Sequence, residues 1–165
     1  MTDEATLVHV RLRALPLALR ARSQEHEHDL LRELALIRVS AESEGLSAAP
    51  GRLLDLADEL RGTYGALAAG PDALMEAAAD RGEAAVDVTY TVPVELRPVL
   101  HQAAAVLDEA EQFCRDGRYL LTLAAPPDVA AFRTWVFAEF DRQITGGDPV
   151  PWPESPQART VAGDG

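Results

Sequence analysis

The chain contains one cysteine, no lysine and few aromatic residues. Cys114 alone cannot form an internal disulfide, and one thiol provides no C-x-x-C metal or redox motif. No apolar run approaches the ~20 residues that a membrane-spanning helix requires. The first residues, MTDEATLVHV, carry acids where a secretory signal peptide carries basic residues. We therefore expect a cytoplasmic protein with a reduced thiol.

Basic residues are also in the minority. The 27 acidic residues exceed the 15 basic residues, all of them arginine, by 12, which gives a net charge of −12. Such a charge repels both a phosphate backbone and an anionic bilayer. We therefore expect no nucleic-acid or membrane partner. The sequence also contains neither a G-x-S-x-G motif nor a glycine-rich phosphate loop, so it provides no support for nucleophilic or phosphoryl-transfer enzymes and implies no cofactor.

The length of 165 residues is sufficient for one domain that needs neither a disulfide nor a structural metal. We expect this domain to span residues 1–145. From Gly146 the composition shifts to Gly, Pro and Asp, which predicts an extended or disordered tail over residues 146–165. Trp152, in the segment PVPWPESP, is expected to hold the start of the tail against the domain. The alternative is that this segment is a proline-rich ligand for an aromatic groove in another protein.

Alternating apolar and polar residues predict strands at 7–13 and 85–92. A third strand is predicted at 118–123, where the short apolar segment RYLLTL is bounded by Gly and Pro. If the first two strands are neighbours, their polar faces lie side by side and opposite charges can pair. The residues of these polar faces are His9, Arg11 and Arg13 in the first strand and Asp87, Thr89 and Thr91 in the second.

Apolar residues at three- and four-residue steps predict four to five helices, and prolines near several of the helix starts fit the first turn. The last of these helices contains three of the four phenylalanines, so it should supply much of the core. The sequence therefore predicts an α+β fold, in which helices cover a small sheet of about three strands. The predicted helices span 15–38, 51–68, 71–81, 94–116 and 127–144.

The first helix carries the densest polar chemistry. His26 lies on its apolar stripe, together with Ser23 and Leu30, as a residue that completes the core and bonds to a carboxylate would. His26 and His28 project about 200° apart on a helix, so one metal ion cannot bind both. We therefore expect no metal site. The alternative is a polar pocket that His26 forms with the strand residues Arg11 and Arg13.

One edge of this helix is acidic. Glu25, Asp29 and Glu33 follow one another at i,i+4 spacing, where like charges destabilise a helix by roughly 0.2–0.5 kcal/mol per pair. The charges can be neutralised by arginines of the same chain, at positions 11, 13, 22 or 32, or by a basic partner protein. The second alternative predicts a partner-binding surface that consists of Arg22, Glu25, Asp29, Arg32 and Glu33.

Several segments resemble a group of uncharacterised small actinobacterial proteins, and the use of arginine without lysine fits a GC-rich bacterial genome. The similar segments are LRALPLAL (12–19), HDLLRELALI (28–37), VDVTYTVP (86–93), EAEQFCRDGRYLLTL (109–123) and PPDVAAFRTWVFAEFDRQ (126–143). Members of this group are encoded near anti-sigma regulators with a histidine-kinase-like ATPase fold and near STAS-domain antagonists. The resemblance thus implies a regulatory setting. The chain lacks the N-box and G-box glycines of such an ATPase and is not the kinase itself.

Three functional hypotheses follow. The sequence favours a non-enzymatic regulatory or adaptor protein that binds another protein, within a partner-switching signalling system as the resemblance implies. The alternative is a small-molecule or metal-dependent enzyme or sensor that uses His26, Asp29 and Glu33. The third is self-association through the acidic helix or through the aromatic residues of the last helix.

Overall fold

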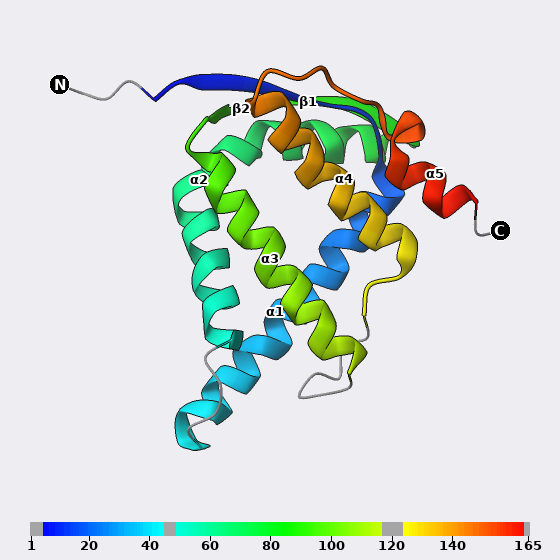
Figure 1. Cartoon of the computed structure of the whole chain (residues 1–165). Helices are drawn as coiled ribbons and strands as arrows, with labels where there is room; N and C mark the ends of the chain where they lie inside the picture. Colours follow the sequence, from blue (N-terminus) through cyan, green and yellow to red (C-terminus); the bar gives the residue numbers. More distant parts are fainter. Residues whose placement is uncertain (1–4, 45–48, 117–123, 164–165) are drawn as a thin grey trace.

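The computed structural model describes residues 5–44, 49–116 and 124–163. Within these ranges the fold is α+β, as predicted, and consists of helices and one antiparallel sheet of two strands. Figure 1 shows the strands at one end of the molecule, with the longer helices below them. In chain order the elements are β1 (Leu7–Pro16), α1 (Leu17–Glu44), α2 (Ala49–Asp80), β2 (Ala85–Pro93), α3 (Leu96–Arg115), α4 (Pro127–Ile144), a 3-10 turn η1 (Trp152–Glu154) and α5 (Pro156–Ala162).

The two strands pair in the register that their alternation favours. Val10 lies opposite Tyr90 and Leu12 opposite Val88, and this face of the sheet packs into the core. The polar faces lie together and are exposed, as predicted. The His9 Nδ1 atom is 3.0 Å from the Thr91 hydroxyl oxygen. The third predicted strand, at 118–123, falls outside the described residues.

Strand β1 is longer than predicted. The sequence placed Leu15 and Pro16 in the first turn of a helix, whereas in the structure they pair with Val86 and Ala85 of β2. A bulge between Leu12 and Leu15 makes this pairing possible because it absorbs one extra residue in β1. Ala14, within the bulge, has a positive φ of 51°, and its N–H donates to the Asp87 side chain at 2.7 Å.

The helices predicted at 51–68 and 71–81 are a single helix, α2, with Pro71 inside it. The prediction of a break was wrong because a proline within a helix removes one hydrogen bond and bends the helix, and tertiary packing can tolerate that loss. Figure 1 shows α2 changing direction along its length, so that its second half runs beneath the strands. Met75 and Ala78 of this half are buried against the sheet's core face.

Helix α4 supplies much of the core, as predicted. Its Trp135 is fully buried, and the ring lies 5.9 Å from that of Phe132 and 5.6 Å from that of Trp152. Trp152 thus packs against the domain, as expected. The Trp135 Nε1–H group also donates to the Val150 carbonyl at 3.0 Å.

In the described part of the tail predicted for 146–165, residues 146–151 form no helix or strand, whereas η1 and α5 occupy most of residues 152–162 in place of an extended or disordered segment. Two local features start α5. Ser155 is the N-cap, and its hydroxyl accepts a hydrogen bond from the Ala158 N–H at 3.1 Å. Pro156 occupies the first helical position, where a missing N–H costs nothing. These features at the start of α5 and the packing of the partly buried Trp152 ring stabilise the described part of the tail.

A polar network joins α4 to β1 and to the segment before η1. The Gln143 side chain accepts from the Arg11 backbone N–H at 2.8 Å and donates to the Arg11 carbonyl at 2.9 Å. It also donates to Glu139, a fully buried carboxylate, at 2.9 Å. Glu139 in turn accepts from the Val150 N–H at 3.0 Å and pairs with Arg142 at 2.7 Å. The buried charge is therefore stabilised by an arginine and two hydrogen bonds.

Candidate functional site

Charged side chains from three helices meet between α1, α3 and α4. Glu111 of α3 and Arg133 of α4 are both buried, and their side chains form an ion pair of 3.1 Å. His26 of α1 lies at the edge of this pair, with its Nε2 atom 3.6 Å from the Glu111 carboxylate. The other Glu111 oxygen accepts from the Ala125 backbone N–H at 3.0 Å. Glu111 is thus the centre of the cluster, and it also holds the chain segment that leads into α4.

Arg133 retains an unused donor. Its Nη2 atom donates to Glu111, whereas its buried Nη1 atom has no hydrogen-bond partner among the described residues. The side chain is only 10% exposed. An arginine donor that is buried without an acceptor is unfavourable by about 1–3 kcal/mol or more. Such a group calls for an explanation, and one explanation is a ligand that the site is built to bind.

Glu27 of α1 adds a second carboxylate to this region. Burial raises its pKa above the ordinary value of 4.5, while the charges of Arg133 and His26 and a hydrogen bond with Ser23 act in the opposite direction. Burial is the largest of these effects because the charged form loses its hydration. The folded protein therefore binds a proton at Glu27 more tightly than the unfolded chain does.

Replacing Glu27 with glutamine is expected to stabilise the protein at neutral pH. Because the folded-state pKa is the higher one, wild-type stability falls as pH rises from the unfolded pKa through the folded pKa. The increase in the free energy of unfolding that Glu27→Gln causes should therefore be present above the folded-state pKa. It should vanish at about pH 3.5, where Glu27 is protonated in both the folded and the unfolded state. Urea unfolding at pH 7.5 and pH 3.5 measures both values.

The matched control is Glu25→Gln, an exposed position on the same helix. This substitution should change stability by less than about 0.5 kcal/mol at either pH. A gain from Glu27→Gln that is equal at both pH values would contradict the effect of burial on this carboxyl group.

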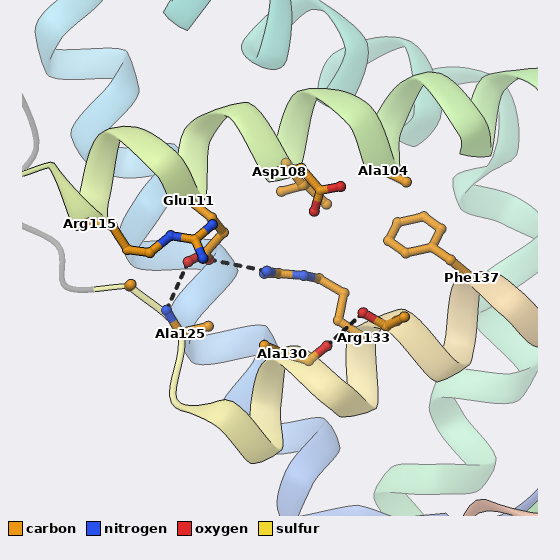
Figure 2. Close-up of a pocket in the computed structure, with 11 residues that line it drawn as sticks. Ala104, Asp108, Glu111, Arg115, Ala125, Ala130, Arg133 and Phe137 are labelled. Carbon is orange, nitrogen blue, oxygen red and sulfur yellow. Dashed lines mark hydrogen bonds and ion pairs between the residues drawn. The ribbon is translucent and has the colours of Figure 1, made fainter. Parts of the chain in front are cut away.

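A cavity of about 320 Å³ opens beside the Glu111–Arg133 pair. Figure 2 shows the two side chains reaching towards each other from α3 and α4, with Phe137 and Asp108 on the same side of the cavity. The lining combines two acids and two arginines with apolar groups. The lining residues are Ala104, Leu107, Asp108, Glu111, Arg115, Ala124, Ala125, Ala130, Arg133, Thr134 and Phe137.

A second cavity, of about 190 Å³, lies between α1, α2, α3 and α4 and shares Leu107 and Phe137 with the first. Among the described residues that line it, Glu27 is the only charged one and the others are apolar. They are Leu30, Leu31, Leu56, Ala57, Leu60, Leu100, Ala103, Leu107 and Phe137. A charged hollow and an apolar hollow therefore adjoin across the same two side chains.

The structure does not assemble the pocket that was predicted from His26, Arg11 and Arg13. The two arginines lie on the exposed face of β1, and Arg13 pairs with Asp87 at 4.0 Å. His26 instead faces α3, where its carboxylate neighbour is Glu111. The described residues contain no group of three or more His, Cys, Asp or Glu side chains that could hold a metal ion.

The acidic edge of α1 is partly neutralised within the chain. Asp29 pairs with Arg32 at 3.7 Å. Arg22 reaches Asp128 in the first turn of α4 at 3.2 Å, and this hydrogen bond lowers the pKa of Asp128. Glu25 is exposed and Glu33 is half-buried. Of the two alternatives, neutralisation by an arginine of the same chain is therefore seen at Asp29, whereas Arg22 pairs with a carboxylate of α4.

Sequence reasoning did not identify Glu27, Glu111 or Arg133 as site residues. One signal was present, because Glu111 follows Leu107 by four residues and Arg133 follows Val129 by four, which places each on the inner face of its helix. The pairing of these two residues across helices has no signal in a single sequence.

Comparison with family models, with curated proteins and with solved structures finds no match for this chain. Among the described residues, no helix has the length and apolar character needed to cross a membrane.

Proposed function

We propose that this protein is a non-enzymatic regulatory domain that binds a small molecule in the cavity between α3 and α4. The observation that carries the proposal is the buried Arg133, which contributes to the cavity lining and whose Nη1 donor has no hydrogen-bond partner in the described part of the chain. At about 320 Å³ the cavity reaches the lower end of the range that ligand sites occupy. A few polar groups among apolar ones are also typical of such sites.

The site is suited to binding rather than to catalysis. Its two buried charged groups, Glu111 and Arg133, are joined in an ion pair of 3.1 Å, so neither of these two is available to move a proton. The described residues supply no metal cluster, and the sequence supplies no nucleophile motif. A ligand here would bridge α3 and α4, and α1 contacts the same cluster through His26. Binding would thus couple to the position of three helices, as a regulatory domain requires.

The test is a thermal shift screen of the purified protein against amino acids, monocarboxylates, amines, nucleosides and sugars. A ligand at one hundred times its Kd should stabilise the protein by about 2.7 kcal/mol, which raises the Tm by roughly 5–11 °C. Thr134→Trp, at an exposed position on the cavity lining, should abolish the shift because the indole fills the cavity.

Thr160→Trp, at an exposed position on α5, is the control and should respond like the wild-type protein. The proposal fails if no compound produces a shift, or if Thr134→Trp retains every shift that the wild-type protein shows.

The second candidate is an adaptor that binds another protein through the acidic edge of α1. The observations in its favour are the net charge of −12, exposed Glu25 and a Leu36 side chain that is 65% exposed. The regulatory setting implied by the sequence resemblance fits this role. Replacing Glu25 and Asp29 with arginine should abolish co-purification of a specific partner from the native host. Retention of that partner would reject the α1 surface.

A further inference from the structure

We infer that the ligand is a free α-amino acid with an apolar side chain. This inference rests on the proposed function and specifies its substrate class. The ligand would place its carboxylate and ammonium groups in the charged cavity, and its side chain between Leu107 and Phe137 towards the apolar cavity.

The charges of the first cavity favour a molecule that carries both signs. Asp108 and Glu111 supply two negative charges to its lining, and Arg115 and Arg133 supply two positive charges. A simple anion would be repelled by the carboxylates, and a simple cation by the guanidinium groups. A zwitterion can orient its two ends towards opposite charges, so both of its charged groups are attracted to the lining.

Each end of the zwitterion has a matching group. Arg133 has its Nη1 donor without a described acceptor, and a carboxylate is the acceptor that fits a guanidinium best. Arg115, which is exposed, can approach the same carboxylate from α3. Asp108 is also exposed and lines the cavity one helical turn before Glu111, so it can accept from the ammonium group.

The adjoining apolar cavity can accommodate the apolar side chain of the ligand. Leu107 and Phe137 line both hollows, so a group that passes between them leaves the charged residues and meets mainly leucine and alanine. Burial raises the pKa of Glu27, the charged group at one end of the apolar cavity. With about 320 and 190 Å³, the two hollows suit a single small metabolite. They are too small for a dinucleotide cofactor.

Isothermal titration calorimetry of the wild-type protein tests the ligand class. Leucine, methionine and phenylalanine are titrated alongside two fragments of leucine, namely isocaproate, which lacks the ammonium group, and isopentylamine, which lacks the carboxylate. At least one amino acid should bind ten or more times more tightly than either fragment. Equal binding of an amino acid and one of the fragments would overturn the inference.

Substitutions at two exposed positions test the contacts to each end of the ligand separately and leave the core undisturbed. Asp108→Asn should weaken amino-acid binding at least tenfold and should not weaken isocaproate binding, because it removes a carboxylate that repels the anion. Arg115→Gln should weaken amino-acid binding and should not weaken isopentylamine binding, because it removes a guanidinium group that repels the cation. Glu95→Gln, exposed at the chain segment before α3, is the matched control and should bind like the wild-type protein. Variants that bind amino acids normally would overturn the assignment of these roles.

The two proposals fail in different ways. If a sugar, a nucleoside or another class gives the thermal shift and Thr134→Trp removes it, the small-molecule function stands and the amino-acid inference falls. If no compound gives a shift that depends on Thr134, both fall.

Discussion

Arg133→Met is expected to lower the free energy of unfolding by about 3–5 kcal/mol, the usual cost of removing one partner from a buried ion pair. Methionine fills much of the space of the arginine stem, so the loss reflects charge rather than volume. Glu111, which is only 6% exposed, would then retain its negative charge without its guanidinium partner. For a chain of this length the Tm should fall by roughly 6–20 °C. Urea unfolding and calorimetry measure the change.

The double variant Arg133→Met with Glu111→Leu distinguishes a charge effect from a packing effect. With both charges removed, little of the electrostatic cost remains, and apolar replacements of buried ion pairs are often neutral or stabilising. The double variant should therefore be more stable than Arg133→Met alone, although it loses the Glu111 hydrogen bond to the Ala125 N–H. A double variant that is less stable than the single variant would show that packing around α3 and α4 dominates.

Trp135→Ala should lower the free energy of unfolding by a similar 3–5 kcal/mol, for a different reason. The indole is fully buried between Phe132 and Trp152, so its removal leaves a cavity among aromatic rings. The hydrogen bond from Nε1 to the Val150 carbonyl is lost as well. Both losses affect the attachment of the tail. Hydrogen exchange of residues 150–162 should accelerate more than exchange in α1.

Trp135→Phe isolates the hydrogen bond because it keeps most of the ring volume. We expect it to cost about 1–3 kcal/mol, since the Val150 carbonyl is left without its indole donor. The prediction of a core role fails if Trp135→Ala unfolds at the same urea concentration as the wild-type protein.

The elements that were predicted well are those with a strong periodic pattern. Val8 to Arg13 and Val86 to Thr91 alternate strictly, and both segments are strands with their polar faces side by side. The predicted bounds of helix α4, 127–144, agree with the structure because Pro126 and Pro127 mark its start and aromatic residues follow at helical spacing. Local pattern was sufficient in these segments because a two-residue or 3.6-residue period determines which face is buried.

The errors occurred where tertiary contacts override local signals. Pro71 indicated a helix start, yet burial of Met75 and Ala78 stabilises one continuous helix through it. Leu15 and Pro16 were assigned to a helix because the bulge at Ala14 has no sequence signature. The tail was expected to be extended or disordered because its composition shifts to Gly, Pro and Asp, and the helices η1 and α5 were not predicted, although the packing of Trp152 against the domain was.

For the candidate site, the sequence predicted a histidine beside a carboxylate but not which residues contact one another. His26 was identified as a residue at the edge of the core beside a carboxylate, and the structure supplies Glu111 from α3 as that carboxylate. The sequence pointed instead to Asp29 and Glu33, since those residues are near in the chain. Arg133 and Glu111 are 22 positions apart, and only the packing of α3 against α4 brings them together.

The contact of Gln143 with Arg11 bears on how copies of this chain behave at high concentration. A two-stranded ribbon exposes backbone groups along its outer rim, and such rims template intermolecular pairing and fibril growth. Gln143 occupies both the N–H and the carbonyl of Arg11, as a neighbouring strand would. The Gln143 side chain thus blocks the backbone groups in the middle of β1, and it opposes pairing with a strand of another molecule at that point.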